Sequence, residues 1–385
     1  MRHGLDEALA AVARRETEMF EQTRAWVEVN SHTDHVAGVD AMGARLAEAF
    51  ALPGLAHETW AAEGRGAHHV WRTAAQGARV LLVGHHDTVF PPGHFEGWRE
   101  EGGRATGPGA LDMKGGLAII RAVLATLADA GVLAELPLAV VSVSDEEIGS
   151  PTSRPHLEAL ARGAACALVF ESGRVADAIV TRRRGTGVLR VTSRGRAAHA
   201  GNAHREGANA IWALARFIDL AQRLTDYARG VTVNVGTITG GTSKNTVPDE
   251  ARCVVDLRFE SVADANALLA ALRAAADEAT LGVPNTSLTF DGGVSRLPME
   301  RTDASAALYR EYAACQRASG LGDGETPLIG GGSDANTVSA VGVPAIDGLG
   351  PRGAGFHTQT EYVELASFVP KAQALLRFLW ARLEV

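Results

Sequence analysis

The sequence has few cysteines and no long apolar run, and each shortage excludes a class of protein. Only 3 of its 385 residues are cysteine, and none of them belongs to a CxxC pair. Three thiols in apolar segments provide neither a disulfide framework nor a thiolate metal site. The N-terminal stretch is acidic and no segment has about 18 consecutive apolar residues, so we expect no signal peptide and no membrane span. These features predict a cytoplasmic protein.

Positive charge is also scarce. The chain has 37 Lys and Arg residues against 45 Asp and Glu residues, which gives a net charge of −8. Its one dense basic run, residues 182–184, is too small for a nucleic-acid-binding surface. An apolar share of 46% and a charged share of 21% are typical of a globular protein. A chain of this length exceeds what one core usually serves, so two domains are expected.

Apolar strands alternate with helices at both ends of the chain, which predicts an open, mostly parallel α/β sheet with helices on both faces. Ligands bind such sheets beyond the carboxyl ends of the strands. The expected helices cover residues 5–30, 39–51, 115–130, 304–319, 334–340 and a segment from 365, and the expected strands cover 68–71, 79–84, 136–143, 165–170 and 344–346.

The middle of the chain has a different pattern. Strands at 187–193, 232–238, 252–259 and 287–290 enclose helices at 209–224 and 263–278. This β-α-β-β-α-β order predicts an inserted ferredoxin-like α+β domain. We therefore expect a catalytic domain from residues 1–180 and 293–385 and an inserted lid and dimerisation domain at 181–292, with hinges near residues 180 and 292.

Two adjacent carboxylates, Glu146 and Glu147, follow the expected strand 136–143. Adjacent side chains at the end of a strand point in different directions, so one can ligate a cation while the other faces a substrate. A solvated acidic loop is the alternative, because most charge runs are solvated. His85 and Asp87 follow the strand 79–84, and their i, i+2 spacing lets the carboxylate hold the second imidazole nitrogen.

Three more candidates, Asp112, Glu171 and His357, lie in other polar segments. Two histidines and three carboxylates suit a pair of zinc ions with one bridging carboxylate, although sequence separation alone does not bring them together. Most of the thirteen histidines lie in polar contexts, where we expect surface or loop positions: His3, His32, His35, His57, His68, His69, His94, His156 and His204.

These segments resemble the dinuclear zinc amidohydrolases, the family that includes glutamate carboxypeptidase, aminoacylase, acetylornithine deacetylase and succinyl-diaminopimelate desuccinylase. The resemblance covers nearly the whole chain. It rests on seven segments in family order, at residues 84–89, 109–116, 145–150, 170–171, 195–201, 330–334 and 355–363.

The resemblance implies a ligand set and a mechanism. His85 and Glu171 would hold one zinc ion, Glu147 and His357 the other, and Asp112 would bridge them, with Co²⁺ or Mn²⁺ able to substitute. The bond between Asp112 and Met113 is expected to be a cis peptide.

It also implies three further roles. Glu146 would be the general base for a zinc-bridged hydroxide, and Asp87 would clamp His85. His199, from the inserted domain, would stabilise the oxyanion and reach a neighbouring subunit's site. A surface loop histidine is the alternative for His199.

Substrate recognition is implied for five residues. Arg184, Asn245, Arg258 and Arg296 resemble carboxylate-binding residues, and the glycine loop that ends at Gly332 would let backbone approach the ligand. A strand-edge salt bridge is the alternative for Arg258, and a capped helix entry is the alternative for the glycine loop. Residues 295–298 depart from the family's Arg-Pro-Pro pattern, which leaves the side-chain pocket undefined.

The implied reaction is hydrolysis of the amide bond of an N-acyl amino acid or of a C-terminal residue. Glutamate at position 171 resembles the acylase and carboxypeptidase branch, and the glycine triplet resembles glutamate carboxypeptidase. The alternatives are an N-acyl amino acid deacylase of the acetylornithine deacetylase type and a metal-free protein that binds amino-acid conjugates. Expected partners are a small-molecule amide with a free carboxylate and a second copy of the chain, joined through the inserted domain, but neither nucleic acid nor membrane.

Competing motifs are poor. Residues 348–353 fit GxGxxG, but they contain a proline and no helix is expected after them, so a dinucleotide site is not predicted. The sequence has no GxSxG elbow and no P-loop, which argues against serine hydrolases and nucleoside triphosphatases.

Overall fold

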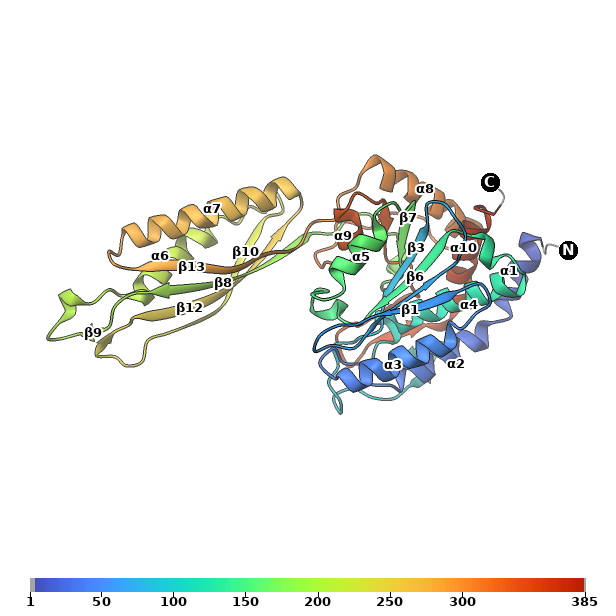
Figure 1. The fold of residues 1–385 in the computed structure, drawn as a ribbon, viewed down its shortest axis with the longest axis horizontal. Coiled ribbons are helices and arrows are strands. Elements are labelled where there is room, and N and C mark those ends of the chain that lie inside the picture. The colour runs from blue at the N-terminus through green and yellow to red at the C-terminus, as the bar shows by residue number, and fades with distance from the viewer. Residues whose placement is uncertain (1–3, 384–385) are drawn as a thin grey trace. The chain divides into compact units, whose positions relative to one another are not determined.

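The computed structural model describes residues 4–383, and the chain divides into two compact units (Figure 1). The first unit runs to Arg182, resumes at Arg301–Leu328 and continues from Ser333 onward. The second unit consists of Arg183–Glu300 and Ile329–Gly332.

A six-stranded sheet forms the centre of the first unit, in the order β1-β2-β6-β3-β7-β14. The last four strands in this order are parallel, whereas β2 and β1 run antiparallel to their neighbours. The expectation of an open, mostly parallel sheet is thus confirmed. The strands are β1 (Ala56–Trp60), β2 (His68–Arg72), β3 (Val80–His85), β6 (Leu138–Val143), β7 (Cys166–Val169) and β14 (Ala345–Ile346).

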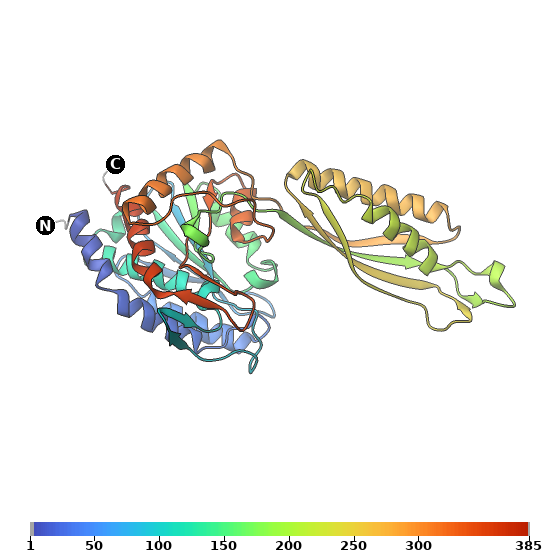
Figure 2. The same ribbon diagram turned by 180° about the vertical axis from the view of Figure 1, so that it is seen from behind.

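Helices pack on this sheet and on one another. Successive residues of β3 point to opposite faces, and both Leu81 and Leu82 are fully buried, so both faces of the sheet are covered. α8 and α10 pack against each other, and Figure 2 shows them side by side in front of the sheet. The helices are α1 (Leu5–Ala13), α2 (Glu16–Val27), α3 (Val36–Ala49), α4 (Gly115–Asp129), α5 (Arg154–Ala161), α8 (Asp303–Ala318), α9 (Asp334–Ala340) and α10 (Phe368–Trp380).

The first expected helix, residues 5–30, is wrong as a single element. It is two helices, because the backbone of Arg14 and Arg15 closes the last turn of α1 before Arg15 starts α2. The break lets α1 pack against α10 while α2 packs against α4. Neither glycine nor proline marks the position in the sequence.

The edge strand β1 and two buried histidines also differ from expectation. Four of the five residues of β1 are exposed, so the strand has no apolar signal. His68 and His69 of β2 are buried, not at the surface, because β2 lies between β1 and β6. His68 accepts a hydrogen bond from the Ser144 backbone N–H at 3.1 Å.

A second sheet of the first unit, in the order β15-β16-β5-β4, is not predicted by the sequence. Each of its strands has two or three residues, which is too short for a periodic pattern to emerge. The strands are β4 (Arg99–Glu101), β5 (Arg104–Thr106), β15 (Gly353–Ala354) and β16 (Tyr362–Glu364).

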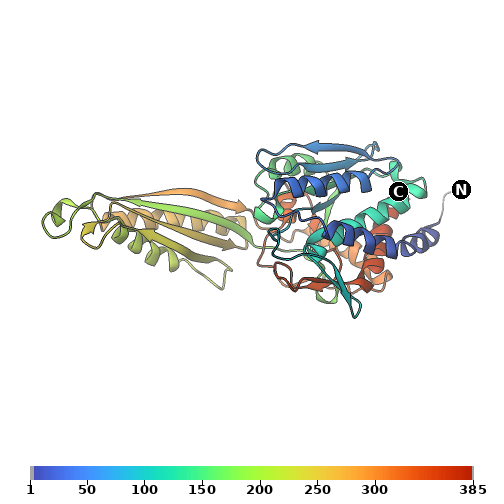
Figure 3. The same ribbon diagram turned by 90° about the horizontal axis from the view of Figure 1, so that it is seen from below.

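The second unit is an antiparallel sheet in the order β10-β12-β8-β13, with two helices on one of its faces (Figure 3). Element order and strand order are those of the predicted ferredoxin-like domain. Strand β13 continues past the expected end at residue 290. The elements are β8 (Gly185–Arg194), β9 (Ala198–His199), α6 (Ala210–Gln222), β10 (Thr232–Gly240), β11 (Thr246–Val247), β12 (Glu250–Phe259), α7 (Val262–Leu281) and β13 (Ser287–Arg296).

The three cysteines are free thiols, as expected. Cys166 and Cys253 are buried and Cys315 is partly exposed. Among residues 4–383, no helix is both long enough and apolar enough to cross a membrane.

Candidate metal centre

The carboxyl ends of three neighbouring parallel strands bring the first candidate residues together. β3 ends at His85, which lies opposite the last residue of β6, Val143. The turn after β6 carries Glu146 and Glu147, and Glu171 follows β7, the other neighbour of β3. The sequence prediction for these positions therefore agrees with the observed register.

Asp112 lies between two imidazoles, those of His85 and His357. Its Oδ1 is 3.1 Å from His85 Nε2, and its Oδ2 is 3.5 Å from His357 Nε2. Glu171 Oε1 lies 3.6 Å from His85 Nε2, and Glu147 Oε2 lies 3.1 Å from His357 Nε2. One carboxylate thus faces two histidines, each of which has a further carboxylate of its own.

Six side chains form a compact cluster: His85, Asp112, Glu146, Glu147, Glu171 and His357. Ligand atoms of His85, Glu146 and Glu171 lie within 4.8 Å of one another, and so do those of His85, Asp112 and Glu147. The peptide bond from Asp112 to Met113 is cis, as the resemblance implies.

Charge is crowded in this cluster. Burial and the neighbouring Asp112 raise the pKa of Glu147 to about 8, and the same two causes raise the pKa of Glu171 well above its usual range. Hydrogen bonds to Asp112 and Glu147 raise the pKa of His357 to about 10. The carboxylates therefore need more positive charge than the histidines supply. Two imidazole nitrogens with several carboxylate oxygens are a donor set that fits divalent zinc-like cations.

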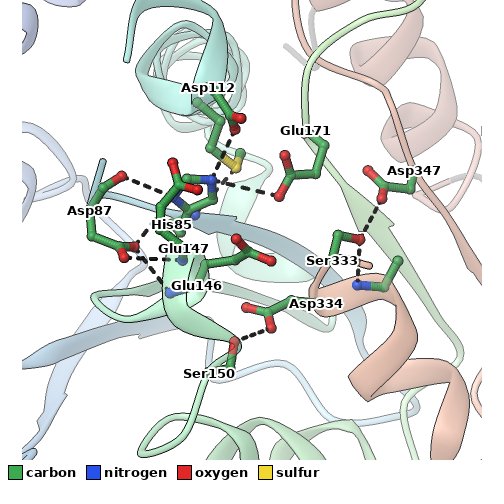
Figure 4. Close-up of polar contacts among 12 residues, drawn as sticks. His85, Asp87, Asp112, Glu146, Glu147, Ser150, Glu171, Ser333, Asp334 and Asp347 are labelled. Atoms are coloured by element: carbon green, nitrogen blue, oxygen red, sulfur yellow. Dashed lines mark hydrogen bonds and ion pairs between the residues drawn. The ribbon is translucent and has the colours of Figure 1, made fainter. Parts of the chain in front are cut away.

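Asp87 fixes both His85 and the turn after β6. His85 Nδ1 lies 3.0 Å from the Asp87 carbonyl oxygen and 3.3 Å from its carboxylate, so Nε2 is the nitrogen that faces Asp112. The carboxylate also accepts hydrogen bonds from the backbone N–H groups of Glu146 and Glu147, each at 3.2 Å (Figure 4).

Asp334 contacts the other end of the turn that carries Glu146 and Glu147. The sequence does not predict this contact. The Ser150 hydroxyl donates to Asp334 Oδ1 at 2.5 Å, and both residues are buried (Figure 4). Ser333, the N-cap of α9, donates to Asp347 Oδ2 at 2.6 Å. The only available sequence signal was the polar pair after the glycine loop, which also fits a plain helix cap.

The other predicted residues belong to the second unit, where they form two groups. His199 and Asn245 lie together, because β9 pairs with β11 and the Ala200 N–H donates to the Asn245 carbonyl oxygen at 2.9 Å. His199 is exposed, and its Nδ1 accepts hydrogen bonds from the backbone N–H groups of Gly201 and Asn202, each at 3.1 Å.

The arginines form the second group. Arg258 of β12 and Arg296 of β13 both lie opposite Thr186, one on each side of β8. Arg258 binds Asp256 through two hydrogen bonds of 2.9 Å, as in the alternative salt bridge. Arg184 donates to Glu260 at 3.0 Å, Arg296 is buried, and Gly332 is partly exposed at the end of its loop.

Together, a mostly parallel α/β sheet and a cluster of histidines and carboxylates at its carboxyl edge form the kind of centre that metal-dependent hydrolases have. Comparison with known families identifies it more closely. Residues 81–381 match the model of peptidase family M20/M25/M40. The chain belongs to this family and is a metallopeptidase or amidohydrolase.

Individual relatives and solved structures agree. The chain is 29% identical to carboxypeptidase G2 of Pseudomonas sp. (strain RS-16) over 76% of its length and 71% of that protein. It is 30% identical to a succinyl-diaminopimelate desuccinylase of Methylobacterium sp. (strain 4-46), over 80% of this chain and 81% of that protein. The crystal structure of a Staphylococcus aureus tripeptidase matches its fold with a TM-score of 0.79 at 19% identity, covering 96% of this chain and 99% of that one.

Proposed function

We propose that this protein is a dinuclear zinc enzyme that cleaves the amide bond of an N-acyl amino acid or of a C-terminal residue. One observation carries the proposal: the two oxygens of Asp112 face two different imidazoles, at 3.1 and 3.5 Å. His85 and Glu171 would hold one ion, and Glu147 and His357 the other, with Asp112 between them. The donor set supports zinc, with Co²⁺ or Mn²⁺ as substitutes.

Two zinc ions bound there would lower the pKa of a shared water toward ~7 and polarise the substrate carbonyl. Glu146 would take a proton from the attacking water and deliver it to the leaving nitrogen. Its position supports this role, because its carboxylate lies within 4.8 Å of ligand atoms of His85 and Glu171. Asp87 keeps Glu146 in place by accepting its backbone N–H at 3.2 Å.

His199 would donate a hydrogen bond to the oxyanion of the tetrahedral intermediate. Its Nδ1 accepts two backbone N–H groups and so carries no proton, which leaves the neutral ring's proton on Nε2. An imidazole whose donor nitrogen is fixed in this way is suited to stabilise developing negative charge.

We infer that His199 acts in the site of a partner subunit. Its group and the arginine group lie at opposite ends of β8, a strand of 10 residues that spans roughly 30 Å. A small substrate held near Arg184, Arg258 or Arg296 cannot also contact His199 of the same chain. A homodimer through the second unit resolves this separation.

The second unit offers a surface for that homodimer. Trp212 of α6 and Ile238 of the edge strand β10 are 54% and 55% exposed. A Cβ added at Gly240 of β10 would lie 3.1 Å from Ile211, so the helix start and the strand end adjoin. Exposed apolar side chains beside an unpaired strand edge are typical of an association surface.

The substrate would carry a free carboxylate beside the scissile bond. The names of the relatives support this class, since they include a carboxypeptidase and a desuccinylase. Arg184, Arg258 and Arg296 are the proposed carboxylate ligands from one chain, with Gly332 close to the ligand. Asn245 lies beside His199 and would therefore join them from the partner subunit. The free thiols support a cytoplasmic location.

A substrate panel tests the proposal. Zinc-loaded protein should release free amino acid from N-acyl and peptidyl conjugates of glutamate, aspartate, arginine or leucine, and amidation of the terminal carboxylate should raise KM. Release from the acyl conjugates alone would favour the deacylase alternative. No release from any conjugate by a protein with two zinc ions would contradict the proposed substrate class, and no bound metal would favour the binding-protein alternative.

A further inference from the structure

The backbone that carries Asp112 has two N–H groups that its own segment does not satisfy. Residues 110–114 are irregular, since Asp112 and Met113 depart from helical dihedral angles. The N–H groups of Ala110 and Lys114 donate within the loop, to Gly107 and Gly109. Those of Leu111 and Asp112 need an acceptor from elsewhere, because buried backbone donors are almost always paired.

Both N–H groups donate to the same atom, Glu361 Oε1. The distances are 2.8 Å from Leu111 and 3.1 Å from Asp112. Glu361 is fully buried, and it lies about 250 residues away in sequence from the segment that it holds. The mechanism proposed above gives this carboxylate no chemical role.

Glu361 also stands at the end of the loop that carries His357. Its N–H donates to the Thr358 carbonyl oxygen at 3.1 Å, and Thr358 N–H donates in turn to Gly355 at 3.0 Å. The next residue, Tyr362, pairs with Thr106 of β5. One side chain thus fastens the loop of His357 to the loop of Asp112.

We propose that Glu361 is a positioning residue of the metal centre, whose single oxygen orients Asp112 between His85 and His357. The inference rests on the proposed dinuclear function. Glu361 is not one of the residues proposed to hold the ions; it would act through the backbone of Asp112. Loss of this anchor would free the Asp112 carboxylate to rotate, and the centre would lose the ligand that both ions share.

Three substitutions of Glu361 separate the effect of its acceptor oxygen from the effect of its charge. Because both donors reach one oxygen, the amide oxygen of Glu361→Gln can accept both hydrogen bonds. Glu361→Asp keeps the charge but withdraws the carboxylate by one methylene group, and Glu361→Ala removes the acceptor. Glu364→Gln is the matched control, because this nearby carboxylate accepts from Arg352 Nε at 3.0 Å and makes no contact with the Asp112 loop in the described structure.

The experiment measures zinc bound per chain at buffered free zinc, together with the visible absorption of the Co²⁺-loaded proteins. We expect Glu361→Asp and Glu361→Ala to bind the second ion about 10- to 100-fold more weakly and to show altered Co²⁺ bands. Glu361→Gln and Glu364→Gln should retain wild-type affinity and bands. Near-UV circular dichroism of each variant reports folding independently of metal.

Two results would overturn the inference. Wild-type affinity and bands in a folded Glu361→Asp or Glu361→Ala protein would show that Asp112 needs no anchor. A Glu361→Gln protein that binds zinc as weakly as Glu361→Ala would show that an oxygen able to accept both hydrogen bonds is not enough to hold Asp112. Failure of the proposed function looks different, because the wild-type protein itself would then bind fewer than two ions or hydrolyse no amide.

Discussion

At the scale of single residues, neighbouring groups fix which ring nitrogen of His85 and of His199 is left for the proposed chemistry. Asp87 contacts Nδ1 of His85, so Nε2 faces Asp112, at 3.1 Å from its Oδ1. In the second unit, two backbone N–H groups donate to Nδ1 of His199, so Nε2 is the ring nitrogen that can act as a donor. Both arrangements fix the orientation of the imidazole ring without a substrate, as the proposed catalysis would require.

Replacement of His199 by alanine should separate catalysis from metal binding. We expect kcat to fall by about 10²- to 10³-fold, because an oxyanion donor is lost. Zinc content should remain at the wild-type level, since His199 is outside the ligand cluster. Steady-state kinetics and metal analysis of the same preparation check this, and a parallel loss of zinc and turnover would refute the donor role.

Acid should destabilise the first unit through its buried histidines. Burial lowers the pKa of His69 to about 4 and also lowers the pKa of His68 and His86. The unfolded chain binds these protons near pH 6.5, so the stability of the neutral forms is present above that pH and is lost as the pH falls toward 4.

Replacement of His69 isolates this effect. Between about pH 7.5 and about pH 5, His69→Gln should lose about 2 kcal/mol less unfolding free energy than the wild type. Urea denaturation of both metal-free proteins at the two pH values gives the difference. Equal losses would mean that the folded chain protonates His69 as readily as the unfolded chain does.

At the scale of elements, close packing of α4 on the end of β7 positions Glu171. A Cβ at Gly116 of α4 would lie 2.3 Å from the Phe170 carbonyl oxygen, one residue before Glu171. The helix can approach the strand end only because this residue has no side chain.

Gly116→Ala should therefore lower both stability and metal affinity. Overpacking at this contact is expected to cost about 1–3 kcal/mol of unfolding free energy, although alanine is the better helix former. Gly324→Ala is the control, since a Cβ there would meet no atom within 4 Å. Urea unfolding and zinc titration of both variants test this, and a Gly116→Ala protein as stable as the control would contradict it.

The strand ends also explain how much of the site the sequence predicts. His85, Glu147 and Glu171 directly follow apolar runs, and parallel strands bring their carboxyl ends to one edge. The positions of Asp112 and His357 follow only from the family resemblance, because their loops have no periodic pattern. The anchoring contacts of Asp334 and Glu361 join segments 184 or more residues apart, which no local pattern encodes.

At the scale of the whole molecule, the proposed homodimer makes the two active sites depend on each other. If His199 acts in the partner's site, mixing two inactive variants should restore activity. In a heterodimer of His199→Ala and Glu146→Gln chains, one site has both defects and the other has none.

A random mixture of the two co-expressed chains should then reach about a quarter of wild-type activity, because half the dimers have one intact site of two. Each variant alone is the control. A mixture that stays as inactive as its components, with heterodimers demonstrated by two affinity tags, would mean that His199 acts within its own chain or not at all.

The most direct test of the central claim measures zinc content and amide hydrolysis together, on the wild type and on Glu146→Gln. We predict two zinc ions per chain in both proteins, loss of wild-type turnover after chelation, and turnover in Glu146→Gln reduced by at least about 10²-fold with zinc retained. Full turnover in Glu146→Gln, or hydrolysis that persists in the chelated wild type, would contradict the proposed dinuclear mechanism.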